Sequence, residues 1–193
     1  MTPNLKNLLA KLESFGHEND LEHKERPKRM LNITRATGEF LAVLIQATNA
    51  RNILEIGTSN GYSTLWLADA CQLTDGHVTT VELSDYKIEL ASANFAEAGL
   101  GARITQRQAD AGIILSETPD ASIDLLFLDS ERSEYCGWWP DIKRVLKKQG
   151  LLVVDNATSH EAEMQPFADI VTHDPGFNTS LVPVGNGEFL AVK

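Results

Sequence analysis

The chain has 193 residues, of which 42% are hydrophobic and 23% charged, and its formal net charge is −10. This length favours one domain with a substantial core, and the composition is typical of a water-soluble globular protein. The acidic balance argues against nucleic-acid binding, and no apolar run is long enough to span a membrane, so small-molecule chemistry is the better expectation.

The N-terminus, MTPNLKNLLAKLESFG, is too polar and too acidic for a signal or transit peptide. Cys71 and Cys136 form neither a metal-binding spacing nor a disulfide framework. We therefore expect both thiols to be reduced and the protein to be cytoplasmic.

Helices are expected before the first strand. The spacing of Leu5, Leu8, Leu9, Leu12 and Phe15 predicts a helix over residues 4–15, and a second apolar stripe predicts a helix over residues 36–49. The charged residues 17–29 read as a loop or a short helix. We expect residues 1–35 to form an N-terminal helical extension or cap, and residues 36–193 to form the main body of a single domain.

Strands and helices then alternate along the chain. Strand-like runs occur at residues 52–56, 77–83, 103–107, 123–128 and 150–154, and helical patterns separate them at 62–71, 85–98, 110–116 and 140–148. Residues 179–184 and 188–192 flank Gly185-Asn186-Gly187, which predicts a β-hairpin. The expected fold is α/β and doubly wound, with helices on both faces of a mostly parallel sheet that ends in an antiparallel pair.

The first strand ends in a glycine loop, in the segment NILEIGTSNGYS at residues 52–63. Gly57 and Gly61 form a G-x-x-x-G pattern, and Ser59 occupies the place of the glycine that makes room for a pyrophosphate in dinucleotide-binding loops. The loop therefore favours a nucleoside cofactor without phosphates, such as S-adenosylmethionine, over NAD. An ordinary glycine turn is the alternative interpretation.

Acidic residues follow the next two strands. Glu82 ends the second strand, where a carboxylate can accept both hydroxyls of a ribose, although an acid there also suits the start of a helix. Asp110 follows the third strand and could accept from the amine of adenine or act only as a helix N-cap.

Oxygen ligands follow the fourth and fifth strands. The fourth strand ends at Asp129, and the fifth strand ends at Asp155-Asn156. We expect these two strands to be neighbours, which would bring two carboxylates and an amide oxygen together. Such a set suits Mg²⁺ or another divalent cation, whereas each residue alone would be an ordinary turn former.

Together these residues resemble the S-adenosylmethionine-dependent O-methyltransferases of the catechol O-methyltransferase type, from about Met30 to Lys193. The resemblance implies a seven-stranded Rossmann-like sheet and an enzyme that methylates a hydroxyl of a small catechol-like or polyhydroxylated molecule. It also implies a metal held by Asp129, Asp155 and Asn156. The cofactor contacts that it implies are Asn32, Ile33, Glu55, Gly57, Thr58, Gly61, Tyr62, Ser63, Glu82, Leu83, Asp110, Ala111 and Asp129.

One departure concerns the general base. The family often has Asp-x-x-Lys after the fourth strand, and this chain has Asp129-Ser-Glu131-Arg132. Arg132 cannot give up its proton at a working pH. Two routes to deprotonation remain: a metal lowers the pKa of the substrate hydroxyl, or His160 accepts the proton. The alternative interpretation of His160 is an exposed loop residue without a catalytic role. Arg132 could instead bind a substrate carboxylate or pair with Glu131 or Glu134 at the surface.

Several functions therefore remain open at this point. A metal-dependent O-methyltransferase is the main expectation, with Asp129, Arg132 and His160 as candidate catalytic residues. A metal-independent methyltransferase of the same fold and a non-catalytic cofactor-binding module are alternatives. Trp138 and Trp139 could line a substrate lid, but packing or a subunit contact is the favoured interpretation, and a homodimer is an open expectation.

Overall fold

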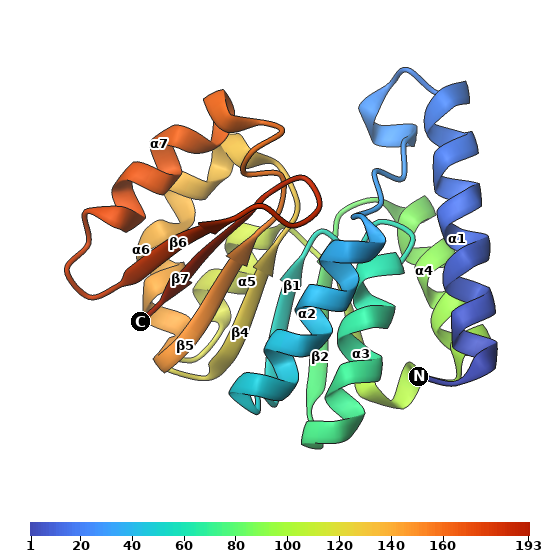
Figure 1. Cartoon of the computed structure of the whole chain (residues 1–193), viewed down its shortest axis with the longest axis horizontal. Coiled ribbons are helices and arrows are strands. Elements are labelled where there is room, and N and C mark those ends of the chain that lie inside the picture. Colours follow the sequence, from blue (N-terminus) through green and yellow to red (C-terminus); the bar gives the residue numbers. More distant parts are fainter.

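A seven-stranded sheet in the order β3-β2-β1-β4-β5-β7-β6 lies between two layers of helices in the computed structural model, which describes all 193 residues (Figure 1). Strand β7 is antiparallel to both of its neighbours, and the other six strands share one direction. The strands are β1 (Asn52–Ile56), β2 (His77–Glu82), β3 (Ile104–Gln108), β4 (Ile123–Leu128), β5 (Leu146–Val154), β6 (Asn178–Val182) and β7 (Glu188–Val192). The expected doubly wound sheet is confirmed.

Seven α-helices cover the sheet. They are α1 (Pro3–Glu22), α2 (Arg35–Thr48), α3 (Tyr62–Thr74), α4 (Asp85–Ala98), α5 (Ala111–Glu117), α6 (Tyr135–Val145) and α7 (Glu161–Thr172). Single 3₁₀ turns occur at Arg26–Lys28, Gly101–Arg103 and Arg132–Glu134. None of the helices combines the length and the apolar character that crossing a bilayer requires.

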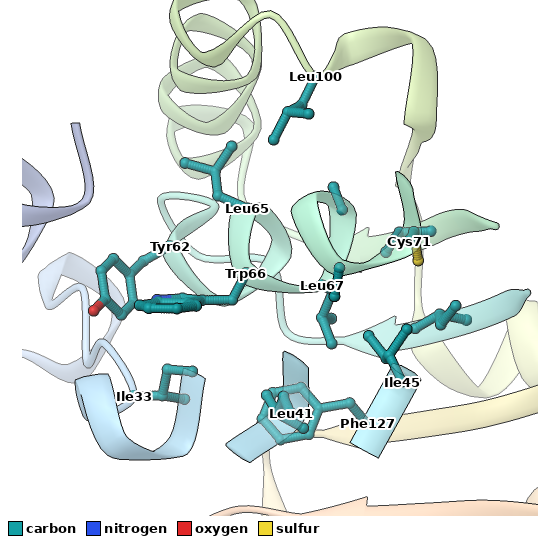
Figure 2. Packing of buried hydrophobic residues seen from close by; sticks show 14 of the residues in the cluster. Ile33, Leu41, Ile45, Tyr62, Leu65, Trp66, Leu67, Cys71, Leu100 and Phe127 are labelled. Atoms are coloured by element: carbon teal, nitrogen blue, oxygen red, sulfur yellow. The ribbon is translucent and has the colours of Figure 1, made fainter. Parts of the chain in front are cut away.

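The two faces of the sheet carry separate hydrophobic cores. Ile53 packs in the core under α1, α2, α3 and α4, whereas the next residue, Leu54, packs in the core under α5, α6 and α7. This alternation follows from the pleat of a strand, and it explains why the central strands are apolar on both sides. Figure 2 shows Trp66 of α3 packed between Tyr62, Ile33 and Leu41 in the first of these cores.

Helix α1 is longer than its apolar stripe predicts. Thr2 caps its first turn, and the helix continues through the charged residues to Glu22, so the loop expected from residue 17 begins only after residue 22. Its leucines belong to the same core as α2 and α3, and residues 1–35 therefore pack as part of the domain. Exposed charged residues carry little periodicity, which is why the end of this helix is not visible in the pattern.

Two helices near the C-terminus depart from the sequence pattern. Helix α6 begins at Tyr135, five residues before the expected start, and holds Pro140 in its interior. Helix α7 contains Pro166 and has no counterpart among the expected elements. In both, an apolar face outweighs the cost of a proline: α6 buries Tyr135, Trp139, Ile142 and Val145, and α7 buries Met164, Phe167 and Val171.

The predicted C-terminal hairpin is confirmed and has an unexpected position. Strand β7 inserts between β5 and β6, which brings the turn at residues 183–187 to the edge where the parallel strands end (Figure 1). Gly187 has a φ of +89°, and a Cβ there would overlap the Thr158 hydroxyl. Backbone bonds from Ala157 to Gly187 and from Thr158 to Asn186 fix the turn against the loop after β5.

Candidate active site

A single cavity of about 1180 Å³ runs along the carboxyl ends of the strands. Its wall combines the loops after β1, β2, β3, β4 and β5 with residues 26–33 and the hairpin turn at Asn186. The expected site residues on the wall are Asn32, Ile33, Gly57, Thr58, Tyr62, Ser63, Glu82, Leu83, Asp110, Ala111, Asp129, Arg132, Asp155, Asn156 and His160. The topology thus gathers residues from most of the chain into one space.

The glycine loop after β1 contacts the loop after β4. Gly57 has a φ of +108°, and a Cβ there would overlap the carbonyl oxygen of Asp129. The Asp129 N–H in turn donates to the Ile56 carbonyl over 3.0 Å. Only glycine allows the β1 and β4 loops to approach so closely, and the loop has no space to spare on that side.

Glu55 supports this loop from behind. The side chain is fully buried, and its carboxylate accepts hydrogen bonds from Ser63 Oγ and Thr80 Oγ1, both over 2.6 Å, and from Thr64. Burial raises the pKa of Glu55 to about 7, against the opposing effect of these hydroxyls. Neither Glu55 nor Gly61 lies on the cavity wall, so the expected direct contacts of these two residues with a cofactor have no support in this geometry.

Glu82 presents its carboxylate to the same space but is already heavily bonded. Oε2 accepts from the Ser59 N–H over 2.9 Å, and Oε1 accepts from the N–H groups of Leu83 and Ser84. A carboxylate has about four acceptor sites, so roughly one remains for a ribose hydroxyl unless a backbone bond is shared. Asp110 caps α5 through Oδ1, which accepts from Ile113, and leaves Oδ2 free at the cavity.

Residues 30–33 form part of the cavity wall next to the glycine loop. Both carboxylate oxygens of Asp20 accept backbone bonds, from Met30 N over 2.7 Å and from Leu31 N over 2.9 Å. Ser59 Oγ donates to the Met30 carbonyl over 2.6 Å, which ties this segment to the glycine loop. The sequence pointed to Ser59 only as the residue in place of a loop glycine, and it gave no functional signal for Asp20, because the contacts of both side chains join distant segments.

The acidic end of the cavity follows from the pairing of β4 with β5. Leu128 is opposite Val154, so the next residues, Asp129 and Asp155, leave the sheet side by side. Asn156 has a φ of +66°, and its Nδ2 donates to Asp129 Oδ1 over 3.2 Å and to Asp155 Oδ2 over 2.8 Å. Burial raises the pKa of Asp129 well above its usual range, and the nearby Asp155 carboxyl raises it further.

Glu188 is a buried acid next to Asp155, outside the cavity wall, and the sequence pattern gave no signal for it. It lies at the start of β7 with no exposed surface, and its Oε1 accepts from Thr37 Oγ1 over 2.9 Å. Its other oxygen and Asp155 Oδ1 are both buried without a hydrogen-bond partner, and the two carboxyls are close enough to interact electrostatically. Burial first, and then the Asp155 charge, raise the pKa of Glu188 to about 9.

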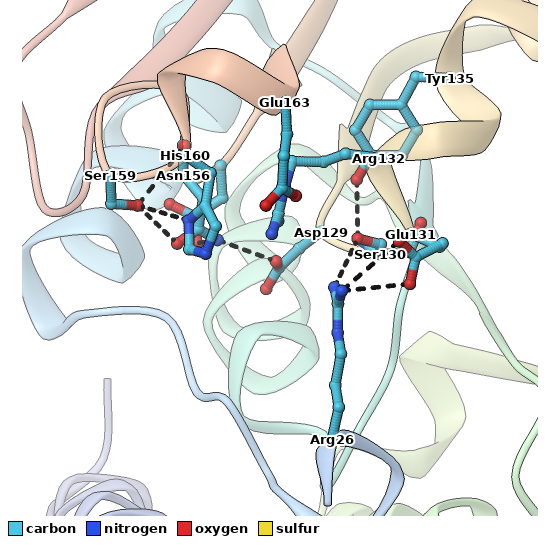
Figure 3. Close-up of polar contacts among 11 residues, drawn as sticks. Arg26, Asp129, Ser130, Glu131, Arg132, Tyr135, Asn156, Ser159, His160 and Glu163 are labelled. Atoms are coloured by element: carbon cyan, nitrogen blue, oxygen red, sulfur yellow. Dashed lines mark hydrogen bonds and ion pairs between the residues drawn. The ribbon is translucent and has the colours of Figure 1, made fainter.

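Arg132 and His160 also line the acidic end of the cavity, and Figure 3 shows His160 beside Asn156 and the end of the Arg132 side chain directed toward Asp129. The structure does not pair Arg132 with Glu131 or Glu134 at the surface; the side chain is 6% exposed and donates from Nε to Glu163 of α7 over 2.9 Å. His160 is half-buried, its Nδ1 lies 2.9 Å from Ser159 Oγ, and its Nε2 has no protein partner. Glu163 lies in helix α7, for which the sequence pattern gave no signal, and Ser159 lies in the turn before that helix.

Trp138 and Trp139 lie in different surroundings. Trp139 is buried against Phe167 and Phe177, as packing predicts. Trp138 is half-buried and lies on the cavity wall, where its indole Nε1 closely approaches Gly112 next to Asp110. Tyr135 accepts a hydrogen bond from Ser130 N over 2.8 Å, which fixes the loop after Asp129.

The fold and this cavity define a Rossmann-like methyltransferase architecture, and solved structures share it. An O-methyltransferase from Bacillus cereus in complex with S-adenosylhomocysteine (SAH) superposes with a TM-score of 0.80 at 22% identity, covering 96% of this chain and 90% of that one. TomG from Streptomyces achromogenes, an O-methyltransferase involved in tomaymycin synthesis and solved with S-adenosylmethionine, gives 0.77 at 24% identity, covering 100% and 90%.

The chain belongs to the O-methyltransferase family, whose model matches residues 7–193. A Mycobacterium tuberculosis protein named "Probable O-methyltransferase Rv1220c" is 30% identical over 174 residues, which cover 83% of this chain and 77% of that protein. The expected enzyme class is therefore confirmed.

Proposed function

We propose that the protein transfers a methyl group from S-adenosylmethionine to a hydroxyl of a small, catechol-like or polyhydroxylated molecule, with the help of a divalent cation. The observation that carries this proposal is the continuity of the cavity. One wall holds the glycine loop, Glu82 and Asp110, and the other holds Asp129, Asp155 and Asn156. A methyl donor and an acceptor can therefore meet without leaving the enclosure.

In this proposal the cofactor half binds through fixed groups. Glu82 accepts from the ribose, the free Oδ2 of Asp110 accepts from the adenine amine, and Asn32, Ile33 and Tyr62 close the sides. S-adenosylmethionine supplies a methyl group on a cationic sulfonium, so the sulfide leaves as a neutral group. The protein must therefore align the acceptor oxygen and help to deprotonate it, and rigid positioning contributes strongly to such a reaction.

The proposed metal ligands are Asp129, Asp155 and Asn156. Their oxygens have the chemistry that Mg²⁺ prefers, and Asp155 Oδ1 is a buried acceptor without a hydrogen-bond donor. The set holds only two carboxylates, and no three His, Cys, Asp or Glu side chains converge here as a complete metal centre, so water and substrate would complete the coordination. Asn156 would have to turn its amide, because Nδ2 now faces both carboxylates. A bound divalent cation would lower the pKa of a substrate hydroxyl.

Arg132 stays protonated, so proton transfer falls to other groups. His160 is the side chain placed to accept the proton, since its Nε2 is free on the cavity wall. We infer that His160 assists and that the cation provides most of the activation.

The experiment that tests the proposal combines binding and turnover. Calorimetry should show binding of S-adenosylmethionine or SAH and none of NAD. Labelled S-adenosylmethionine with a panel of catechols should then give methylated product, which EDTA abolishes and Mg²⁺ restores. Binding of NAD in place of SAH would overturn the cofactor assignment, and absence of methyl transfer to any hydroxyl would overturn the reaction.

A metal-independent methyltransferase is the second candidate, and one observation favours it. The Asn156 amide already donates to both aspartates, and the buried Arg132 charge lowers the pKa of both, so the acid pair has partial compensation within the protein. Activity that survives EDTA in the wild-type protein would support this candidate over the first.

A further inference from the structure

Arg132 is the only buried cation of the chain, and its ion pair does not account for its burial. Its side chain is 6% exposed, whereas that of its partner, Glu163, is 55% exposed. Buried charges are normally tolerated only when partners satisfy them. Glu163 satisfies one of the five N–H groups of the guanidinium, the one on Nε.

The other four N–H groups, on Nη1 and Nη2, make no hydrogen bond or ion pair with the protein. They are not sealed in the core, because Arg132 forms part of the cavity wall and neither nitrogen is a buried unpaired atom. Figure 3 shows the end of the side chain directed toward the Asp129 side of the cavity, between Glu163 and the loop at residues 129–131. The guanidinium therefore presents its outer edge to a ligand.

The backbone that carries Arg132 is held on several sides. Asp129 N donates to Ile56 over 3.0 Å, Ser130 N donates to the Tyr135 hydroxyl over 2.8 Å, and Arg26 Nη2 donates to the Ser130 carbonyl over 3.4 Å. Glu163 fixes the guanidinium plane through Nε. A donor that is already oriented loses little conformational freedom on binding, so it can discriminate strongly between ligands.

We propose that the acceptor substrate carries a carboxylate, which binds the free Nη edge of Arg132 while the neighbouring hydroxyl faces the Asp129–Asp155 pair. This inference rests on the proposed function, since the carboxylate and the reacting hydroxyl belong to one molecule in one cavity. Two parallel N–H groups match the two oxygens of a carboxylate, a geometry that a lysine at this position would not provide. Arg132 is then a specificity-determining residue.

The surrounding charges favour a carboxylate over a phosphate. Glu131, Glu134 and Glu163 lie on the same wall, and they would repel a dianion more than a monoanion. Arg26 is a weaker candidate for the same task, because its side chain is 47% exposed and already pairs with Glu131 over 3.2 Å. Arg26 therefore serves as a matched control, since it is a second arginine on the same wall.

The test compares protocatechuate with its primary amide, which keeps both ring hydroxyls and removes the charge. Binding of each in the presence of SAH is measured by calorimetry, and kcat/KM is measured with S-adenosylmethionine and Mg²⁺. We expect the acid to be favoured about tenfold or more in both measurements. The amide withdraws electrons more strongly and has the more acidic hydroxyls, so greater hydroxyl acidity does not explain a preference for the acid.

Variants then locate the preference. In Arg132→Gln the acid-to-amide ratio should fall close to one, and Arg132→Lys should keep only part of it. Arg26→Gln removes a second cation of the same wall and only the longest of the contacts that hold the Arg132 backbone, so it should keep most of the wild-type ratio. A phosphorylated catechol that outcompetes protocatechuate would overturn the choice of carboxylate.

The binding measurement separates this inference from the proposed function. Tighter binding of the acid without methyl transfer would support the Arg132 site and count against the reaction. Methylation of acid and amide at equal kcat/KM, with equal affinities, would overturn the Arg132 site and leave the reaction intact. If Arg132→Gln does not fold, the wild-type ratios and the Arg132→Lys variant still decide the question.

Discussion

The half of the cavity proposed to bind the cofactor, which is called the cofactor half here, and the acidic half are built in different ways. In the cofactor half, backbone groups satisfy the charged side chains: Glu82 accepts three N–H bonds and Asp20 accepts two. In the acidic half, burial raises the pKa values of Asp129, Asp155 and Glu188, and Asp155 Oδ1 and Glu188 Oε2 have no hydrogen-bond partner. The carboxylates of the first half therefore have hydrogen-bond donors without a ligand, whereas some carboxyl oxygens of the second half do not.

This difference indicates where binding energy and chemistry reside. Preformed hydrogen bonds make the cofactor half rigid, which suits tight binding of an invariant molecule. Crowded acids raise the free energy of the folded protein, and a cation or a hydrogen-bonding substrate would relieve that cost. If the two halves act separately, a substitution in one half should leave the property of the other unchanged.

Asp155→Ala should abolish Mg²⁺-stimulated methyl transfer, with a loss of about 10³-fold in kcat/KM, because a metal ligand supplies several kcal/mol of charge stabilisation. SAH affinity, measured by calorimetry, should stay within about threefold of wild type, since Asp155 belongs to the acidic half. A parallel loss of SAH affinity would show that the two halves are not separable.

Glu55→Gln should remove a pH dependence of stability. The pKa of Glu55 rises from its ordinary value of 4.5 to about 7 on folding, so its contribution is fully present below pH 4.5 and is lost as the pH rises through about 7. The free energy of unfolding of the wild type should therefore fall relative to the variant by about 3 kcal/mol across that window. Urea titrations at several pH values would measure it, and parallel curves would contradict the assignment.

Glu82→Ala should weaken SAH binding by about 2 kcal/mol, or about 30-fold in Kd, because charge-assisted bonds to the ribose and to the glycine loop disappear together. Glu82→Gln keeps one acceptor oxygen and should lose less. The ratio of activity with and without Mg²⁺ should not change in either variant. Unchanged SAH affinity in Glu82→Ala would assign this acid to the helix start alone.

His160→Ala should lower kcat by less than about tenfold if the cation provides most of the activation. The acidic limb of the pH–rate profile should then move when Mg²⁺ is replaced by another divalent ion. A loss of about 10²-fold or more, with a limb that is the same for every metal, would make His160 the general base.

Glu188→Gln should change stability at pH 7 by less than about 1 kcal/mol, because a neutral amide can keep the bond from Thr37 and donate to Asp155 in place of a carboxyl proton. Glu188→Leu leaves both partners buried without a hydrogen bond and should cost about 2 kcal/mol more. Denaturant midpoints of the two variants provide the comparison. Equal losses would show that Glu188 is not neutral in the folded protein.

The sequence by itself determined the sheet, the glycine loop and the acids at the strand ends. These features are local: apolar runs mark the buried strands, and Glu82, Asp129 and Asp155 each follow such a run directly. Because parallel strands end at one edge of a sheet, their neighbourhood also follows once the strand order of the family is assumed. The bounds of α6 and the existence of α7 were not predicted, because Pro140 and Pro166 indicate helix breaks in the sequence. In the structure the packing of the apolar helix faces outweighs the cost of these prolines.

Only the tertiary structure decided which side chains share the acidic half. Glu188 reaches Asp155 because β7 inserts between β5 and β6, and Glu163 reaches Arg132 from a helix 31 residues away. It also turned Glu55 away from the cavity and buried Arg132, although both sit in segments whose pattern suggested the opposite. The physical reason is that desolvation and pairing of a charge depend on all the atoms around it, and most of those atoms come from distant parts of the chain.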